Sequence, residues 1–306
     1  MIEMEKQTIF SDNEMIYPGL ASCPACTSAL SLRTALKALG NKTIVIMPAS
    51  CSVPMTSLYP KTAVKVPMMF VAFTATASTA AGIAAALKMK GDNETNVLCW
   101  AGDGGTFDIG LQTLSGAAER KDPMVYVCYN NQAYMNTGTQ RSGATPFGAF
   151  TTTTQTGKLV HEKDMQAIVA AHKIPYLATG SPSYPHDLFK KFTKAKDKEG
   201  FRYIEIFAPC PPGWGFPTNE TIKIGRLAVE TGVHVLYEIE DGVYKLSTPS
   251  KKVLDKGRMP IEHFVKAQRR FARMTEEQMN EYQQLIDDRW DDIMAHVEWT
   301  SARSTS

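Results

Sequence analysis

The stretch Ala101-Gly-Asp-Gly-Gly-Thr-Phe-Asp-Ile-Gly-Leu-Gln112, read together with Asn130-Asn131, decides the fold. The first segment follows the apolar run Asn96–Ala101, which predicts a buried strand, and it opens a helical pattern. The Asn pair ends a second apolar run, Met124–Asn130. Two strands joined by a helix run parallel in one sheet, so their carboxyl ends lie at the same edge. We therefore expect the Gly-Asp-Gly-Gly segment and the Asn pair to be neighbours.

The residue types in these two segments suit a diphosphate group and its metal ion. Glycines let the backbone approach phosphate oxygens, and a helix N-terminus offers unpaired N–H groups to an anion. Mg²⁺ prefers oxygen ligands, commonly one or two from the protein and others from phosphates. Asp103 supplies a charged oxygen, Asn131 a neutral one, and the carbonyl of Ala133 is placed to supply a third. A plain turn beside an Asn-rich loop is the simpler alternative, but the paired segments match the motif of enzymes that use thiamin diphosphate.

Strand-like apolar runs alternate with longer helical patterns. The expected strands are Thr43–Met47, Met69–Phe73, Asn96–Ala101, Met124–Asn130, Tyr176–Thr179 and Arg202–Phe207. The expected helices lie near Ser28–Leu39, Ser78–Lys90, Phe107–Glu119, Asp164–His172 and Pro185–Ala195. This alternation predicts an α/β fold, a mostly parallel sheet with helices on both faces. Ligands of such sheets bind at the carboxyl ends of the strands.

The pattern changes after the Pro- and Gly-rich stretch Pro209–Pro217. We therefore divide the chain into residues 1–215, an α/β domain for the cofactors, and residues 216–306, a C-terminal extension of a hairpin and helices. The hairpin is expected to pair His234–Ile239 with Val243–Leu246.

The last helix of the extension is expected to begin at Thr275, which has Gln278 at capping-box spacing. Its apolar positions form one stripe, made of Met279, Tyr282, Ile286, Trp290, Ile293 and Val297. Such a stripe usually packs on the core of its own domain, although it can also bury against a partner subunit. We favour the first of these.

The six cysteines fall into two kinds. Cys99 and Cys128 lie within apolar strands and are expected in the core, because free Cys packs as a small hydrophobic residue. Cys23 and Cys26 form a Cys-x-x-Cys pair, which by itself is compatible with zinc, an iron–sulfur cluster or no metal.

Cys51 and Cys210 each follow a predicted strand, which puts them at the same sheet edge as Asp103. Structural zinc sites usually have a second close cysteine pair, and this chain lacks one. Four thiolates that converge at one edge suit a 4Fe–4S cluster.

The composition excludes several classes of protein. The 306 residues are 43% hydrophobic and 21% charged, which predicts a large core rather than disorder. The net charge is only +2, and the Lys and Arg residues are dispersed along the chain. We therefore expect no nucleic-acid partner. Met1–Met15 has no apolar run, so we expect no secretory signal and a reducing, cytoplasmic setting in which cysteines stay free.

The segment Val66–Leu87 has no charged residue and is long enough to cross a membrane. Pro67 near its start and the Thr and Ser residues in its middle favour a buried strand followed by a buried helix instead. We therefore expect no membrane association.

From about Gly19 to Trp214 the chain resembles the β subunit of the pyruvate:ferredoxin oxidoreductase family in its multi-subunit form. The likeness rests on the four edge cysteines, on the segment 101–112, and on Asn131-Gln-Ala-Tyr-Met-Asn-Thr-Gly138 continued by Ser142-Gly-Ala-Thr-Pro-Phe-Gly148. It implies a thiamin-diphosphate-binding fold whose cofactor residues are Gly102, Asp103, Gly104, Gly105, Asn131, Ala133 and Asn136.

The resemblance also implies roles for the metal ligands. Mg²⁺ would be held by Asp103, Asn131 and the carbonyl of Ala133, and one 4Fe–4S cluster near the thiazolium would be held by Cys23, Cys26, Cys51 and Cys210. Asn136 matches the asparagine that reaches the substrate and the reactive end of the cofactor. Its simpler interpretation is an ordinary turn residue.

The reaction implied is the thiamin-dependent oxidative decarboxylation of a 2-oxoacid, with pyruvate as the favoured substrate and coenzyme A as acyl acceptor. Electrons would pass through the cluster to ferredoxin. Partner subunits are implied as well: one supplies the glutamate that activates the cofactor, and a ferredoxin-like one carries further clusters.

Two departures from the family pattern leave the substrate open. Thr27-Ser28 stand where Gly and then Glu or His commonly follow the second cysteine, and Thr74-Ala75 stand where a Glu-Asn pair is common. The same chemistry on oxalate or on a branched-chain or aryl 2-oxoacid is therefore an alternative. A more remote alternative is a non-catalytic scaffold stabilised by zinc.

Overall fold

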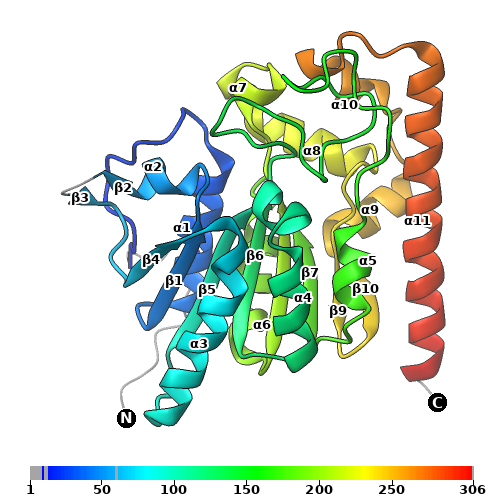
Figure 1. Cartoon of the computed structure of the whole chain (residues 1–306). Helices are drawn as coiled ribbons and strands as arrows, with labels where there is room; N and C mark the ends of the chain where they lie inside the picture. The colour runs from blue at the N-terminus through cyan, green and yellow to red at the C-terminus, as the bar shows by residue number, and fades with distance from the viewer. Residues whose placement is uncertain (1–8, 10–12, 59–60, 305–306) are drawn as a thin grey trace.

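The computed structural model describes residues 9, 13–58 and 61–304 (Figure 1). Its centre is an eight-stranded sheet in the order β10-β9-β7-β8-β6-β5-β1-β4. All of its strands run in one direction except β9, which is antiparallel to both β7 and β10. The strands are β1 Thr43–Pro48, β4 Met68–Val71, β5 Asn96–Gly102, β6 Met124–Asn130, β7 Tyr176–Gly180, β8 Phe201–Phe207, β9 Tyr237–Glu240 and β10 Val243–Leu246. The fold class expected from the sequence is confirmed.

The helices follow the expected alternation with the strands. They are α1 Thr27–Leu39, α2 Ser52–Thr56, α3 Thr76–Met89, α4 Leu111–Arg120, α5 Met165–Ala170, α6 Pro185–Asp197, α7 Pro211–Trp214, α8 Thr221–Glu230, α9 Thr248–Lys256, α10 Glu262–Lys266 and α11 Glu276–Ser304. A small hairpin, β2 Ser57–Leu58 with β3 Lys61–Thr62, lies outside the main sheet. Most of the segment Met1–Met15, for which the sequence predicts no signal, lies outside the described residues.

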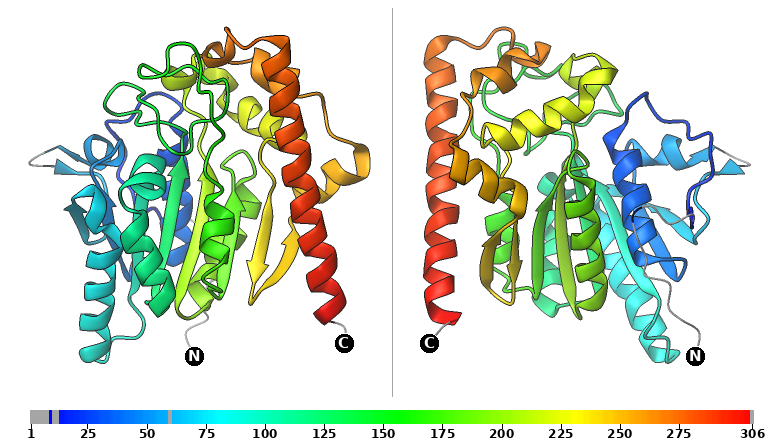
Figure 2. Two further views of the ribbon diagram at one scale, coloured as in Figure 1. Left: turned by 45° about the vertical axis from the view of Figure 1, so that its right-hand side comes forward. Right: turned by 180° about the vertical axis from the view of Figure 1, so that it is seen from behind.

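Helices cover both faces of the sheet, because successive residues of each central strand point to opposite sides. In β5, Cys99 faces the core beneath α3, α4 and α5, whereas Leu98 and Trp100 face the core beneath α1 and α6. Figure 2 shows these two helical layers from both sides. Cys99 and Cys128 are fully buried, so the prediction that they are core residues is confirmed.

The expectation that Val66–Leu87 is buried throughout is wrong. Strand β4 forms the edge of the sheet, and Met69 and Phe70 are 48% and 39% exposed. In α3 only Thr76, Ala77, Ala80 and Ala84 are buried. An apolar run does not reveal that its strand lies at the edge of the sheet, and here Met69 and Phe70, which point to opposite faces, are both left exposed. No helix in the described part of the chain is long and apolar enough to cross a membrane.

The C-terminal elements build onto the same sheet. Strand β9 pairs with β7, so the hairpin extends the sheet rather than forming a separate one. In α11 the stripe faces the chain's own core, where Tyr282, Ile286 and Trp290 are buried.

The start of α11 is capped as expected. The backbone N–H of Gln278 donates to Thr275 Oγ1 at 3.2 Å, and the N–H of Thr275 donates to Gln278 Oε1 at 3.0 Å. These reciprocal bonds are the capping box that the sequence predicts. The division of the chain at residue 215 stays a prediction.

Candidate cofactor site

Four adjacent strands end at the residues that the sequence singles out. The neighbours β8, β6, β5 and β1 are followed in turn by Cys210, Asn131, Asp103 and Cys51. All of these strands are parallel, so their carboxyl ends lie at one edge, at the upper side of the sheet in Figure 1. This edge is where an α/β sheet binds ligands.

Three oxygen-bearing groups converge between β5 and β6. The side-chain amide of Asn131 lies 2.9 Å from Asp103 Oδ1 and 2.9 Å from the carbonyl oxygen of Ala133, and its nitrogen donates to both oxygens. This arrangement closes the site without a cation. With the amide oxygen turned inward instead, three oxygens would face one another, which is the ligand set that a hard cation requires. The residues present therefore fit a magnesium ion.

Asp103 is a buried carboxylate, only 1% exposed. Ser142 Oγ donates to its Oδ2 at 2.5 Å, and the backbone N–H of Asn131 donates to its Oδ1 at 3.2 Å. Burial raises the pKa of Asp103 to about 7, although these hydrogen bonds oppose the shift. A bound cation would lower that pKa again and favour the ionised form.

The chain leaves β5 through a π-helical turn, Gly104–Asp108, and α4 begins only at Leu111. The helix predicted at Phe107–Glu119 therefore starts too early. The turn requires glycine at Gly110, because a Cβ there would lie 2.0 Å from the carbonyl oxygen of Gly105. Single π turns often occur at functional sites, and this one directly follows Asp103.

Tyr134 holds this turn in place, a role that no pattern in the sequence indicates. Its ring packs on Gly104, where a Cβ would lie 2.3 Å from the ring carbon Cε1. Its hydroxyl donates to Asp108 Oδ2 at 2.9 Å. The same carboxylate accepts from the backbone N–H of Gly143 at 3.1 Å and pairs with Lys163 Nζ at 3.2 Å. These bonds tie the loops after β6 to the turn after β5.

A cavity opens at this edge of the sheet. It is lined by Ala49, Ser50, Cys51, Phe73, Gly102, Asp103, Gly104, Gly105, Tyr129, Asn131, Ala133, Tyr134, Met135, Asn136 and Thr137. Every cofactor-binding residue expected from the sequence is in this set. Asn136 lies in a turn and is exposed, so it is both a turn residue and part of the cavity lining.

The four edge cysteines come from segments that contact one another. Cys23 and Cys26 form a turn in which the N–H of Cys26 donates to the carbonyl of Cys23 at 3.2 Å. Next to it, Thr27 Oγ1 donates to the carbonyl of Pro209 at 3.0 Å, which fixes the start of α1 against the loop of Cys210. Cys23 is exposed, and the other three are half-buried.

The four edge cysteines are close enough for their charges to affect one another's pKa values. Burial raises the pKa of Cys51 to about 12, and the charges of the other three cysteines add to the shift. Burial likewise raises the pKa of Cys210 to about 11, and Cys26 and Cys23 contribute. A coordinating metal deprotonates such thiols. Across residues 9, 13–58 and 61–304, no three His, Cys, Asp or Glu side chains are grouped tightly enough to hold one metal ion.

Trp214 connects the loop of Cys210 to the loop of Asn131, a role that no pattern in the sequence indicates. Its backbone N–H donates to the carbonyl of Cys210 at 2.9 Å. Its indole Nε1 donates to the carbonyl of Asn131 at 2.8 Å, and the side chain is fully buried. The loop after β8 is thus held directly against the loop after β6.

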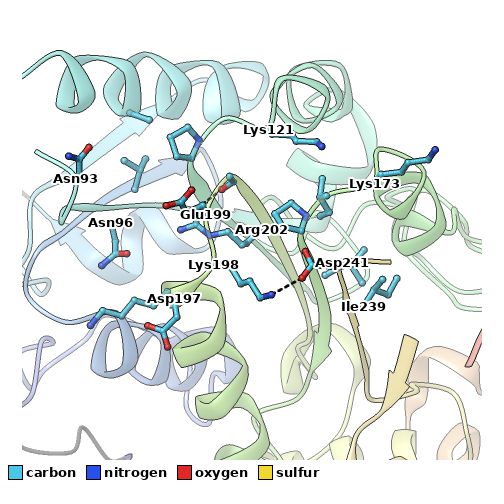
Figure 3. Close-up of a pocket in the computed structure, with 18 of the residues that line it drawn as sticks. Asn93, Asn96, Lys121, Lys173, Asp197, Lys198, Glu199, Arg202, Ile239 and Asp241 are labelled. Carbon is cyan, nitrogen blue, oxygen red and sulfur yellow. Dashed lines mark hydrogen bonds and ion pairs between the residues drawn. The ribbon is translucent and has the colours of Figure 1, made fainter. Parts of the chain in front are cut away.

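A larger cavity lies at the opposite, amino edge of the sheet (Figure 3). Its side chains carry both signs of charge, and Lys198 Nζ pairs with Asp241 Oδ2 across it at 2.8 Å. None of the residues expected to bind a cofactor lines it. The carboxyl edge is therefore the candidate site.

Known proteins share this sequence and this fold. Residues 50–206 match the family described as the C-terminal TPP-binding domain of thiamine pyrophosphate enzymes. The chain is 46% identical over 281 residues to pyruvate synthase subunit PorB of Methanothermobacter marburgensis, covering 90% of this chain and 96% of the relative. The chain belongs to the pyruvate:ferredoxin oxidoreductase β-subunit family.

Another member of this family is 44% identical over 299 residues: ketoisovalerate oxidoreductase subunit VorB of Pyrococcus horikoshii, with 94% of this chain and 95% of the relative covered. A solved 2-oxoglutarate:ferredoxin oxidoreductase of Magnetococcus marinus has the same fold, with a TM-score of 0.57 and 24% identity over 65% of this chain and 67% of that one. The chain is thus a subunit of a thiamin-dependent oxidoreductase. The TPP-binding match encloses Cys51, Asp103 and Asn131, whereas Cys23, Cys26 and Cys210 lie outside it.

Proposed function

We propose that this β subunit binds magnesium thiamin diphosphate and one 4Fe–4S cluster at the carboxyl edge of its sheet, in the cytoplasm. With its partner subunits it would decarboxylate pyruvate oxidatively, pass the acyl group to coenzyme A and pass the electrons to ferredoxin. The main support is that Asp103, Asn131, Cys51 and Cys210 follow adjacent parallel strands. The bond from Thr27 to the carbonyl of Pro209 holds the turn of Cys23 and Cys26 at the same edge. When bound, thiamin diphosphate supplies an electron sink for loss of CO₂, and a cluster accepts electrons one at a time.

The chain's own residues would hold and orient the cofactor. Asp103, Asn131 and the carbonyl of Ala133 would bind the magnesium ion, and the turn Gly104–Asp108 would lie against the diphosphate. Asn136 would meet the substrate, since it lines the same cavity. Tyr134 would keep the turn in place while substrate enters.

Substitution of Asp103 tests the cofactor part of the proposal. Asp103→Asn removes the charged oxygen but keeps the shape, so we expect magnesium thiamin diphosphate to bind at least about tenfold more weakly to the assembled complex. Asp255→Asn is the control, because Asp255 is exposed on α9, away from the site. Calorimetric titration measures both affinities. Equal affinity in Asp103→Asn and wild type would count against this ion site.

The redox chemistry of the relatives favours a cluster over zinc as the centre held by the four cysteines. A zinc ion has no redox chemistry of its own, whereas a relative of this chain is named as an oxidoreductase subunit and a solved structure of the same fold as a ferredoxin oxidoreductase. The zinc-stabilised scaffold is therefore the weaker alternative.

Pyruvate is the favoured substrate, although relatives with similar identity are named for pyruvate and for ketoisovalerate. The two departures from the family pattern have local structural roles: Thr27 bonds to Pro209, and the carbonyl of Thr74 accepts from Thr113 Oγ1 at 2.9 Å. Neither lines the cavity. We expect the assembled complex to show its highest kcat/KM on pyruvate in a panel with oxalate, 2-oxoisovalerate and an aryl 2-oxoacid. A higher value on any of the other three would reassign the substrate.

A partner subunit is needed to complete the site. The carboxylate that lines the cavity is Asp103, which is committed to the metal ion, so the activating glutamate would come from another chain. The exposed apolar residues Met69 and Phe70 of the edge strand β4 lie close in sequence to Phe73 of the cavity and suit that partner. Met69→Lys should abolish copurification of the partner, whereas Met259→Lys, at a similarly exposed methionine elsewhere, should not. Normal assembly of the Met69→Lys chain would exclude this face.

A further inference from the structure

A buried guanidinium lies behind the loop of Cys210. Arg270 is 5% exposed and belongs to a short 3-10 turn, Arg269–Phe271, in the C-terminal extension. The carbonyl of Arg270 accepts from the backbone N–H of Phe150 at 2.7 Å. The neighbouring N–H of Arg269 donates to the carbonyl of Gly215 at 3.4 Å. The extension thus folds back over the cofactor edge and places this charge there.

Arg270 has few partners for a buried charge. Its Nε donates to Gln268 Oε1 at 2.9 Å, and its Cζ lies 3.6 Å from the ring centroid of Trp214. Its Nη2 is buried and has no hydrogen-bond partner. No carboxylate forms an ion pair with it in the described part of the chain. Glu162 and Asp103 act on it only without a direct contact. A buried cation without a direct ion pair is costly and implies an anion that completes the site.

Trp214, on whose ring Arg270 packs, contacts the loops of both proposed cofactor sites. Trp214 bonds to the carbonyl of Cys210 through its backbone and to the carbonyl of Asn131 through its indole. Burial lowers the pKa of Arg270 to about 9, and the charge of Cys210 is among the effects that oppose the shift. Arg270 therefore keeps its positive charge at neutral pH, within electrostatic range of the cysteine.

We propose that Arg270 is the fixed positive charge that sets the reduction potential of the cluster held by Cys23, Cys26, Cys51 and Cys210. The inference rests on the proposed function, because the cluster is part of it. A cluster gains one negative charge when it accepts an electron, so a buried cation nearby stabilises the reduced form and raises the potential. The effect is large where water is excluded, since the effective dielectric constant there is low.

Potentiometric titration tests this role on the full chain reconstituted with iron and sulfide, with the reduced cluster followed by EPR. Arg270→Gln should shift the reduction equilibrium of the cluster on the order of tenfold toward the oxidised form. For one electron this lowers the midpoint potential by about 59 mV. Arg270→Lys keeps the charge and should stay close to wild type. Arg269→Gln is the matched control, because Arg269 is the adjacent but exposed arginine, and it should leave the potential unchanged.

Two results would overturn the inference: an unchanged potential in Arg270→Gln, or an equal drop in Arg270→Lys and Arg270→Gln, which would indicate packing rather than charge. If Arg270→Gln assembles no cluster, the Arg270→Lys variant alone decides. A wild-type cluster potential in Arg270→Lys supports the role of the charge, and a lowered potential contradicts it. A wild-type chain that binds no iron would instead contradict the proposed function. The two failures are thus distinguishable.

Discussion

Gly104 shows how strongly the cofactor edge depends on single positions. Tyr134 occupies the space where a side chain at 104 would stand. Gly104→Ala should therefore lower the free energy of unfolding by about 1–3 kcal/mol through overpacking. It should also weaken binding of magnesium thiamin diphosphate, because the turn Gly104–Asp108 must shift.

Gly82→Ala is the matched control for this substitution. A Cβ at Gly82, on the open side of α3, meets no atom within 4 Å. Alanine there should stabilise the helix by about 0.5–1 kcal/mol. Urea unfolding of both variants measures the two effects, and similar values for both would show that Tyr134 does not constrain the turn.

At the residue scale, the sequence predicts those site residues that follow a readable strand. Asp103, Asn131, Cys51 and Cys210 each come directly after an apolar run, so their shared edge could be anticipated. The contributions of Tyr134, Trp214 and Arg270 could not, because they depend on how loops distant in sequence pack together. Buried arginine and tyrosine have no periodic signal of their own.

The elements themselves were largely predictable, and their surroundings were not. Every strand and helix expected before residue 216 exists, with ends displaced by a few residues. The π turn escaped prediction because its hydrogen-bond pattern depends on the close approach of Gly110 to Gly105. The exposure of β4 and α3 escaped it because edge position in a sheet is set by strand order, which apolar patterning does not encode.

His234 joins the extension to the central sheet and makes that junction sensitive to acid. Its ring stacks on Phe207 of β8 with centroids 4.9 Å apart, and its Nε2 lies 3.2 Å from the carbonyl oxygen of Gly180. Burial lowers the pKa of His234 to about 3, whereas an unfolded histidine titrates near 6.5. As the pH falls below about 6.5, the unfolded chain therefore takes up a proton that the folded chain does not. The stability from neutral, buried His234 is present above that pH and is lost toward pH 3.

His234→Gln removes this titration. Between pH 7 and pH 5 the wild type should lose about 2 kcal/mol of unfolding free energy relative to the variant. Urea unfolding at the two pH values measures the difference, and effects of other titrating groups cancel in the comparison. Parallel pH profiles for the two proteins would contradict a neutral His234 at the junction.

At the scale of the whole molecule, α11 holds the extension against the sheet. Trp290 is 3% exposed, and its Nε1 donates to the carbonyl of Gly232 at 3.1 Å. Trp290→Ala should cost about 3–5 kcal/mol of stability, as large buried aromatics do. Trp299, 59% exposed on the same helix, provides the control, and Trp299→Ala should change stability by less than about 0.5 kcal/mol. Denaturant midpoints report both, and a small effect at Trp290 would mean that α11 does not stabilise the fold.

The cofactor edge is assembled from distant parts of the chain. Cys23 and Cys26 arrive before the first strand of the sheet, Cys210 arrives after β8, and Arg270 arrives from the extension. This long-range assembly explains why no single motif of the sequence describes the site.

The most direct test of this account is the iron and acid-labile sulfide content of the chain, measured together with binding of magnesium thiamin diphosphate in the assembled complex. The account predicts iron and sulfide in the ratio of one 4Fe–4S cluster per β subunit. It also predicts that Cys51→Ser loses the cluster and ferredoxin reduction but still binds the thiamin cofactor, whereas Cys99→Ser, at a core cysteine, keeps both. A single zinc ion in the wild type, or full iron content and full activity in Cys51→Ser, would contradict it.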